Sequence, residues 1–225
     1  MNPSKLILAT QNNGKKNEFQ KLFVGTGIEI IMPSGLEEVE ETGKTFTENA
    51  ILKVDSASGY PPPQPSPSRG EGVTAELASR VDVANAVYPI IADDSGLVIP
   101  ALDGNPGIYS ARWAEKNGVR DFPYAMQKIK DELDARNVPQ ENRTAYFVCL
   151  LAIKYPDGTT QTFEGKAHGH LKFPPKGENN FGYDPIFSPN GYDITFAEME
   201  RAEKNALSHR AKAVAKLLAS WKNAE

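Results

Sequence analysis

Apolar and polar positions in the first part of the chain follow first a strand-like and then a helix-like pattern. Residues 5–10 form a short apolar run that predicts a buried strand, and the turn formers at 11–14 break it. From Lys15 the apolar residues recur at helical spacing, and the glycines within 25–27 are expected to end that helix. Residues 28–32 then predict a second strand.

A second helix is predicted from Thr45. Thr45 and Glu48 have the spacing of a capping box, and an apolar helical stripe follows as far as Ala57. Residues 59–74 are rich in proline and cannot pack or pair their backbone regularly. We expect them to form a flexible insertion inside a domain, since motifs of chemical interest lie on both sides. The chain is therefore expected to be a single domain, residues 1–225.

The second half of the chain adds further strands and a final helix. Residues 90–92 predict a brief strand that ends at the acidic pair behind it. The strongest strand pattern covers 145–154, and 159–164 is expected to pair with it through a turn at 156–158. A helix is predicted from about Ser208 to the C-terminus. Strands interleaved with helices indicate an α/β fold with a mixed β-sheet flanked by helices.

Composition bears on the compartment and the partners that are expected for the protein. Among its 225 residues no apolar run approaches the roughly 20 residues that span a bilayer, so no membrane partner is expected. Cys149 is the only cysteine, which excludes an intramolecular disulfide and favours the cytoplasm. The net charge of −4 argues against broad binding of nucleic acid. One small polyanionic ligand stays compatible with it, because local fields can oppose the net charge.

Residues 10–15 lie between the first predicted strand and the first predicted helix. Such a loop presents backbone amides and the positive end of a helix dipole, which suits a phosphate group. Asn12 and Asn13 tolerate tight turns and donate hydrogen bonds, and Lys15 adds a full positive charge. The alternative interpretation is an ordinary turn with a solvated lysine.

Two groups of acidic residues are candidates for chemistry. Asp93 and Asp94 are expected at the end of an apolar strand, where carboxylates can hold Mg²⁺ and a water that attacks phosphorus. Glu40, Glu41 and Glu48 lie around the start of the second predicted helix. The alternatives are an Asx turn for the aspartates, a helix cap for Glu48 and a solvated charge run for the other two.

Two segments near the C-terminus have the residue types that recognise a nucleobase. The segment 181–185 places two aromatic residues, a glycine and an aspartate together, and aromatic faces stack on bases. If Ser208 caps the last helix, His209 and Arg210 lie in its first turn, where cations are unfavourable unless an anion is present. Lys204 precedes them. A packed aromatic turn and a salt bridge are the alternatives.

Taken together, these motifs resemble those of the inosine triphosphate pyrophosphatase family. Any one of them alone is weak, whereas six in the family's order are highly specific. The segments that carry the resemblance are 8–15, 41–53, 91–97, 104–112, 181–185, and Lys204 with 208–210.

The resemblance implies a fold, an activity and partners. The fold would be a two-lobed single domain around a long mixed β-sheet, with a nucleotide cleft between the lobes, usually as a homodimer. The activity would be that of a nucleoside triphosphate pyrophosphatase, a Mg²⁺-dependent hydrolase that cleans the nucleotide pool. It would convert ITP, dITP and XTP to the monophosphate and pyrophosphate by attack of water on the α-phosphorus.

The resemblance also implies roles for individual residues. Asp94 would be the general base, with Lys15 as the second catalytic residue. Metal ligands would be Asp94 with Glu41 or Glu48. The residues expected to bind substrate are Thr10, Gln11, Asn12, Asn13, Gly14, Lys15, Ser95, Phe181, Gly182, Tyr183, Asp184, Lys204, His209 and Arg210.

The chain departs from the family's pattern at two places. The family usually has a short connection where this chain has 59–88, and often a glycine pair where this chain has Asn179 and Asn180.

Two other functions are alternatives to this one. The nearest rival is a pyrophosphatase of the Maf type, which acts on pyrimidine or modified nucleotides and lacks the Ser-His-Arg ending found at 208–210. The other rival is a catalytically silent protein that senses aberrant purines.

Overall fold

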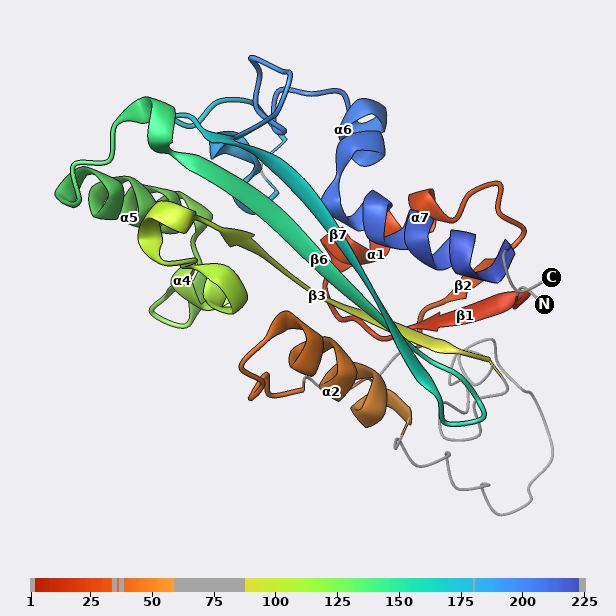
Figure 1. Ribbon diagram of the computed structural model, residues 1–225. Helices are drawn as coiled ribbons and strands as arrows, with labels where there is room; N and C mark the ends of the chain where they lie inside the picture. Colours follow the sequence, from red (N-terminus) through yellow and green to blue (C-terminus); the bar gives the residue numbers. More distant parts are fainter. Residues whose placement is uncertain (1–2, 34–35, 37–38, 59–87, 180, 223–225) are drawn as a thin grey trace, which may run out of the picture. The chain divides into compact units, whose positions relative to one another are not determined.

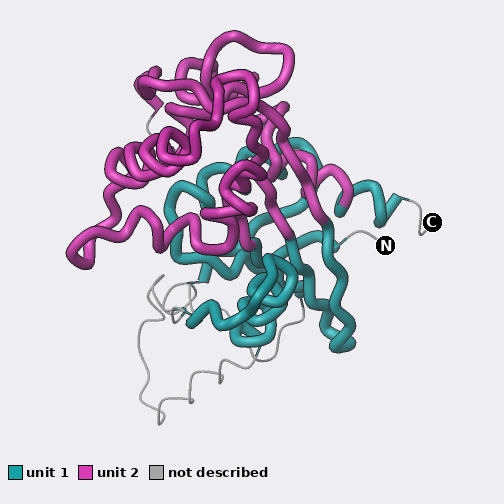
Figure 2. Tube along the Cα trace, turned by 60° about the vertical axis from the view of Figure 1, so that its left-hand side comes forward, with its two compact units in different colours: residues 1–93, 151–163, 217–225 teal, residues 94–150, 164–216 magenta. Residues whose placement is uncertain are grey.

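The computed structural model describes residues 3–33, 36, 39–58, 88–179 and 181–222. They divide into two compact units, shown in Figure 2: unit 1 comprises residues within 1–93, 151–163 and 217–225, and unit 2 those within 94–150 and 164–216. The expected insertion at 59–74 lies outside the described residues. None of the helices described is long and apolar enough to cross a membrane.

Unit 1 is built on parallel strands. β1 (Lys5–Leu8) pairs in parallel with β2 (Glu29–Ile31) on one side and with the start of β3 (Ile90–Val98) on the other. Parallel neighbours need crossover connections, which are right-handed. Helix α1 (Asn13–Leu22) connects β1 to β2, and α2 (Phe46–Ser58) precedes β3. The first connection runs from β1 to β2, and the second returns from β2 past β1 to β3, in the opposite direction. The two helices therefore cover opposite faces of these strands (Figure 1).

Helix α1 begins earlier than the sequence pattern indicated. Asn13 and Gly14, expected in a turn, are its first two residues. Asn12 is the N-cap, and its side-chain oxygen accepts a hydrogen bond from the Lys15 N–H at 3.1 Å. Asparagine is a strong N-cap residue because this bond satisfies an otherwise unpaired amide of the first turn. The loop after β1 is therefore three residues shorter than the segment 10–15 suggested, and Lys15 belongs to the first turn of the helix.

The start of α2 confirms the predicted capping box. The Glu48 N–H donates to Thr45 Oγ1 at 3.1 Å, and Glu48 Oε2 accepts from the Lys44 N–H at 2.5 Å. Ala50, Val54 and Ala57 of the predicted stripe are buried. The capping box thus fixes the point at which the chain enters α2.

Strand β3 is longer than predicted. It does not end at Ala92 but continues through Asp93, Asp94 and Gly96 to Val98. The aspartates read as turn formers in the sequence, yet both are buried within the strand. A buried carboxylate is tolerated only when it is paired or hydrogen-bonded. Asp94 accepts from the neighbouring Ser95 N–H, whereas Asp93 pairs with Lys15, 78 residues away in the chain.

The whole six-stranded sheet has the order β2-β1-β3-β6-β7-β8, which confirms a mixed α/β sheet. β6 (Thr144–Lys154) agrees with the predicted strand, whereas β7 (Thr160–Leu171) extends well beyond the predicted 159–164. Between them the Tyr155 N–H donates to the Thr159 carbonyl at 2.9 Å, and Gly158 has a φ of 87°. β7 pairs antiparallel with β8 (Phe187–Pro189).

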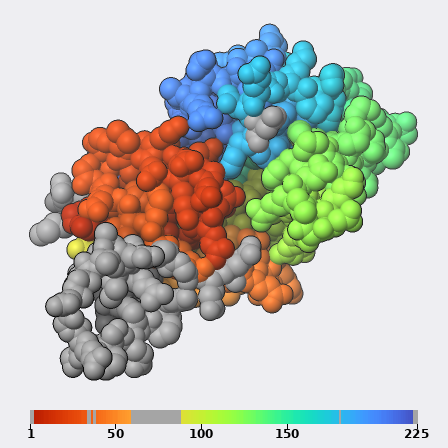
Figure 3. Space-filling model, turned by 180° about the vertical axis from the view of Figure 1, so that it is seen from behind, coloured from red at the N-terminus to blue at the C-terminus, as the bar shows by residue number. Residues whose placement is uncertain are grey.

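Unit 2 packs short helices and a small hairpin around an aromatic core. Its remaining elements are α4 (Ser110–Trp113), β4 (Glu115–Lys116), β5 (Val119–Arg120), α5 (Phe122–Ala135), α6 (Arg201–Leu207) and the first part of α7 (His209–Lys222). Phe147, Phe187 and Phe196 pack on one another in the core. Two stretches far apart in the sequence, coloured green and cyan to blue in Figure 3, lie next to each other on the face of this unit that the view shows.

Candidate active site

The parallel strands of unit 1 have a topological switch point between β1 and β3. The chain leaves β1 toward β2 on one side and returns to β3 on the other, and ligands of α/β sheets bind at such points, beyond the carboxyl ends of the strands. β1 pairs with β3 only as far as Leu8 and Ile91, and the Ala9 N–H donates to the Ile91 carbonyl at 2.8 Å. Asp93 therefore lies just past the end of β1, beside the loop that leads into α1.

Two lysines converge on Asp93. Lys15 Nζ lies 3.0 Å from Asp93 Oδ2 and 3.4 Å from the Asp93 carbonyl oxygen. Lys53 Nζ donates to the same carbonyl at 3.2 Å and pairs with Glu41 Oε1 at 2.6 Å. We call these four residues, Lys15, Glu41, Lys53 and Asp93, the unit 1 cluster. Alternating charges satisfy one another there, at the first turn of α1, where the helix dipole favours an anion.

The loop that carries Glu41 is fixed by a buried asparagine. Asn49 is fully buried in α2, and its Oδ1 accepts a hydrogen bond from the Gly43 N–H at 2.9 Å. A β-carbon on residue 43 would collide with this same oxygen, so only glycine permits the contact. The Glu48 carboxylate is engaged in the capping bond to Lys44. Of the two glutamates expected near a metal, Glu41 is the one that the structure brings beside Asp93.

The short loop before α1 is itself held by hydrogen bonds. The Asn12 N–H donates to Thr10 Oγ1 at 3.3 Å, and Gln11 Nε2 donates to the Leu36 carbonyl. Gln11 and Asn13 are exposed, and Thr10, Asn12 and Gly14 are partly buried. The predicted phosphate segment is therefore a preformed loop with exposed donors.

Asp94 and Ser95 begin the part of β3 that belongs to unit 2. Successive residues of a strand point to opposite faces, so Asp93 and Asp94 project from opposite faces of β3. Asp94 is 4% exposed, and its Oδ1 accepts from the Ser95 N–H at 3.1 Å. Ser95 Oγ accepts a hydrogen bond from Arg210 Nη2 at 3.3 Å. The structure thus brings together Ser95 and Arg210, two predicted site residues from distant motifs.

A second group of predicted residues comes together in unit 2. Lys204 Nζ lies 2.5 Å from Asp184 Oδ2, and both residues are buried. The same ammonium lies 4.9 Å from the centre of the Phe181 ring and 6.0 Å from that of Phe196. Cations are attracted to aromatic faces at such distances. The ion pair is therefore held in an aromatic surrounding.

His209 and Arg210 stand in the first turn of α7, as predicted. Ser208 caps this helix, accepting from the Ala211 N–H at 3.1 Å. The His209 ring is stacked on Phe147, with ring centres 5.0 Å apart and planes inclined by 17°. A β-carbon on Gly165 of β7 would collide with the backbone at His209, so this glycine lets the strand approach the helix. We call Phe147, Phe181, Asp184, Phe196, Lys204 and His209 the unit 2 cluster.

Tyr183 takes a different place from its neighbours. It is 3% exposed, and its hydroxyl donates to the Ser110 carbonyl at 2.7 Å. Burial raises the pKa of this phenol above its ordinary value. Gly182 has a φ of 60°, a conformation that glycine adopts without strain. The Asn180 of the preceding pair lies outside the described residues.

Three contributors were missed by the sequence reasoning about sites. Lys53 completes the unit 1 cluster, Phe147 supplies the ring beneath His209, and Ser110 accepts from Tyr183. Asp93 was a candidate carboxylate, and the structure adds its ion pair with Lys15. Lys53 and Ser110 lie within the segments 41–53 and 104–112 that carry the family resemblance, which was the available signal. The position of Phe147 in a strand gave none.

The carboxylates are the side chains of this region that could bind a metal ion. Within the parts of the chain that the structure describes, no group of three or more His, Cys, Asp or Glu side chains is arranged so that it could hold a metal ion. Mg²⁺ is usually bound through one or two carboxylates together with substrate phosphates and waters. Glu41 in unit 1 and Asp94 in unit 2 each carry oxygen donors of the kind that Mg²⁺ prefers.

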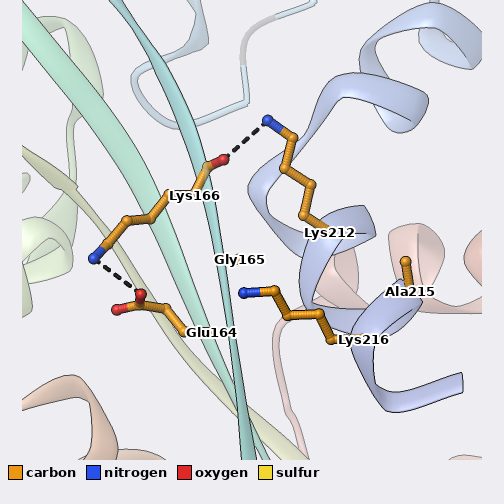
Figure 4. A pocket seen from close by; sticks show the side chains of 6 residues that line it. All are labelled: Glu164, Gly165, Lys166, Lys212, Ala215 and Lys216. Atoms are coloured by element: carbon orange, nitrogen blue, oxygen red, sulfur yellow. Dashed lines mark hydrogen bonds and ion pairs between the residues drawn. The ribbon is translucent and has the colours of Figure 1, made fainter. Parts of the chain in front are cut away.

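A surface hollow of about 410 Å³ lies elsewhere in unit 2, between β7 and α7 (Figure 4). Its lining residues are Glu164, Gly165, Lys166, Lys212, Ala215 and Lys216. Lys166 pairs with Glu164 at 2.9 Å, and Lys212 Nζ donates to the Lys166 carbonyl at 3.0 Å. None of the predicted site residues lines this hollow, so it is not the expected nucleotide site.

Known proteins resemble the chain over nearly its whole length. The chain is 42% identical over 215 residues to the dITP/XTP pyrophosphatase of Ruegeria pomeroyi, covering 95% of this chain and 93% of that protein. It is equally similar to the dITP/XTP pyrophosphatase of Caulobacter vibrioides, 42% over 219 residues, with 96% and 97% covered.

Solved structures and a family model give the same result. The HAM1 protein of Coxiella burnetii superposes with a TM-score of 0.75 at 32% identity, covering 97% of this chain and 98% of its own. The model of the Ham1 family matches residues 6–220. The predicted family is confirmed: the chain belongs to the Ham1 family.

Proposed function

We propose that the chain is a nucleoside triphosphate pyrophosphatase that hydrolyses ITP, dITP and XTP to the nucleoside monophosphate and pyrophosphate. The relatives named above, 42% identical over nearly the full length, carry the name dITP/XTP pyrophosphatase. The observation that carries the proposal is the convergence of Lys15 and Lys53 on Asp93 at the switch point of the sheet. It supplies positive charge where an α/β fold binds its ligands.

The unit 1 cluster and the loop before α1 bind the triphosphate. Lys15 and the exposed first-turn amides of α1 donate to phosphate oxygens, as helix N-termini do for anions. Lys53 remains tied to Glu41 and to the Asp93 carbonyl, so it adds charge from a fixed position. Two lysines held by buried or partly buried carboxylates are preorganised, which reduces the entropy lost on binding.

Asp94 acts as the general base. Its carboxylate, held by the Ser95 N–H, accepts a proton from a water that attacks the α-phosphorus. The bond between the α-phosphorus and its bridging oxygen breaks, and pyrophosphate leaves. Lys15 stabilises the charge that develops on the leaving group, because a fixed cation gains most where negative charge grows in the transition state.

Mg²⁺ is the proposed cofactor. Asp94 and Glu41 would supply carboxylate oxygens to it, with substrate phosphates and waters as the other ligands, and Glu48 stands close in sequence as a further candidate. When bound, the ion neutralises phosphate charge and polarises the phosphorus.

The unit 2 cluster binds the purine. Phe181 and the His209 ring stacked on Phe147 offer aromatic faces, and Lys204 and Arg210 offer donors. Hypoxanthine and xanthine carry a 6-oxo acceptor, whereas adenine carries a 6-amino donor at that position. A donor aimed at the 6-oxo group would stay unsatisfied against adenine, and a buried unsatisfied donor costs about 1–3 kcal/mol. ATP is therefore expected to be a poor substrate.

The proposal includes a cytoplasmic homodimer. Cys149, the only cysteine of the chain, is buried in β6, which suits a reducing compartment. Val119 and Tyr109 of unit 2 are exposed apolar side chains that a second copy could cover. Light scattering after size-exclusion chromatography tests the mass: a value near 49 kDa, about twice the 24.6 kDa of one chain, supports the dimer.

A substrate panel tests the proposed function. Pyrophosphate and inorganic phosphate are measured during incubation with ITP, XTP, GTP, ATP and TTP, first with Mg²⁺ and then with a chelator. We expect rapid release of pyrophosphate from ITP and XTP that stops when the metal is removed. Release mainly from TTP would support the Maf-type rival, and tight binding of ITP without release would support a sensor.

A further inference from the structure

Tyr183 is a core tyrosine whose hydroxyl has a defined partner. The ring is buried, with the edge of Phe122 packed against it at 5.2 Å between ring centres and 87° between planes. The hydroxyl donates to the Ser110 carbonyl at 2.7 Å, across 73 residues of sequence. Phenylalanine would fill the same space, so packing alone does not account for the hydroxyl. A buried hydroxyl needs a hydrogen-bond partner, and here the partner belongs to another segment of unit 2.

Ser110 connects this bond to strand β3. Its Oγ accepts from the Leu97 N–H at 2.9 Å and donates to the Gly107 carbonyl at 2.6 Å. Leu97 is two residues beyond Ser95, on the strand that also carries Asp94. Three hydrogen bonds therefore fix Ser110 between β3 and Tyr183, and Ser110 itself is buried.

Tyr183 in turn lies inside the tight turn that carries Phe181 and Asp184. The Asp184 N–H donates to the Phe181 carbonyl at 3.1 Å, so the two residues move together with the tyrosine between them. Asp184 holds Lys204 at 2.5 Å, and Lys204 faces the Phe181 ring. A shift of Tyr183 would therefore displace both the aromatic face and the ion pair of the unit 2 cluster.

We propose that Tyr183 and Ser110 are positioning residues that hold the turn 181–184 in register with strand β3, and that they thereby set the purine selectivity of the enzyme. The inference rests on the proposed function of the unit 2 cluster. Tyr183 acts through Phe181, Asp184 and Lys204 and does not touch the nucleotide. Its loss leaves Asp94 and Lys15 in place, so it raises KM and relaxes selectivity while kcat is retained.

The test compares Tyr183→Phe with wild type and with Tyr124→Phe, a control that removes a hydroxyl from an exposed tyrosine of α5. KM and kcat are measured for ITP and ATP, and ITP binding is measured by calorimetry in an Asp94→Asn background. For Tyr183→Phe we expect KM for ITP to rise about three- to tenfold, the range that one neutral hydrogen bond is worth, with kcat within twofold. The preference for ITP over ATP should fall by a similar factor, and the control should match wild type.

Ser110→Ala provides a second test of the same connection. It retains the carbonyl that Tyr183 uses and removes the Oγ that binds Leu97 and Gly107. Like Tyr183→Phe, Ser110→Ala should raise KM for ITP. Thermal unfolding of both variants shows whether they are folded at the assay temperature. A stability loss with unchanged KM and unchanged selectivity in folded Tyr183→Phe would overturn the inference and leave the proposed function intact. Failure of the wild-type protein to hydrolyse purine triphosphates would instead refute the proposed function.

Discussion

The two clusters hold their charges in different ways. In unit 1 the side chains of Lys15, Lys53 and Glu41 are 16%, 17% and 27% exposed, and each of the two lysine ammonium groups has two polar contacts within 3.4 Å. In unit 2 the pair of Lys204 and Asp184 is 9% and 3% exposed and is surrounded by aromatic rings. The first arrangement leaves lysines within reach of an incoming anion. The second buries one ion pair in an apolar setting, where geometry matters more than net charge.

Under the proposed function, this difference separates two tasks. Partly exposed lysines would attract any triphosphate, because phosphate groups are common to all nucleotides. A buried pair beside aromatic faces distinguishes bases, because a mismatched hydrogen-bonding group costs most where water cannot replace the missing partner. Variants of unit 1 should therefore change the rate for all nucleotides alike, and variants of unit 2 should change the ranking among them.

The largest effect is expected from Asp94→Asn, which removes the proposed general base. Along the chain, Asp94 lies between the residues of the unit 1 cluster and those of the unit 2 cluster. Hydrolysis of ITP should fall by about 10²–10⁴-fold, the usual contribution of general-base catalysis, and loss of a metal ligand would add to it. ITP binding should persist. Pyrophosphate release and calorimetry check both points, with Asp131→Asn on the exposed face of α5 as the control. Near-normal turnover would remove Asp94 from the mechanism.

Lys204→Met should show how strongly the unit 2 pair depends on burial. It leaves the carboxylate of Asp184 buried without its cation, and breaking a buried pair costs about 3–5 kcal/mol of unfolding free energy. Adding Asp184→Asn to the same chain should restore part of the loss. The matched control is Lys130→Met, whose exposed partner Asp134 lies at 2.5 Å, and it should change stability by no more than about 1 kcal/mol. The free energy of unfolding is measured with urea. Equal losses of it in Lys204→Met and Lys130→Met would contradict the distinction between the buried and the exposed ion pair.

Lys53→Gln should affect all nucleotides equally. The change removes a charge that pairs with Glu41 and donates to the Asp93 carbonyl, and hydrogen bonds of charged groups are worth about 1.5–3 kcal/mol. We expect kcat/KM to fall by about 10- to 100-fold for ITP and ATP alike. The exposed Lys21, near the end of α1, gives the control Lys21→Gln. A fall confined to ITP would mean that unit 1 also reads the base.

The smallest effect concerns alkaline pH. Burial raises the pKa of Tyr183 in the folded protein above its unfolded value of about 10. Its stabilisation is therefore complete below about pH 10 and is lost as the pH rises further, because only the unfolded chain then releases the proton readily. Between pH 9 and 11 the stability advantage of wild type over Tyr183→Phe should shrink by about 1 kcal/mol. Tyr124→Phe should show no such change in denaturant unfolding, and parallel curves for all three proteins would contradict the assignment.

The sequence predicted the local features well because their causes lie within a few residues. The capping box at Thr45 and Glu48 and the cap at Ser208 each depend on neighbours three residues apart, and both were confirmed. The strand predicted at 145–154 was evident from its continuous apolar run, and β6 covers Thr144–Lys154. Six motifs in order were sufficient to identify the family.

The errors arose where distant residues decide the local structure. Asp93 and Asp94 looked like the end of a strand, yet β3 continues through them. Lys15 pairs with Asp93 across 78 residues of sequence and Lys53 reaches it across 40, which no local pattern reveals. Tyr183 bonds through its hydroxyl to Ser110 across 73 residues, a contact that its motif does not reveal. One error had a local cause: helix α1 begins earlier than expected because Asn12 caps it.

The central claim is that water attacks the α-phosphorus and that the triphosphate leaves as intact pyrophosphate. Hydrolysis of ITP in water labelled with ¹⁸O, followed by mass spectrometry of both products, tests it directly. The account predicts one ¹⁸O atom in the inosine monophosphate and none in the pyrophosphate. Label in the pyrophosphate would place the attack on the β-phosphorus, and label in inorganic phosphate would indicate stepwise removal of the terminal phosphate. Either of these results would contradict the proposed mechanism.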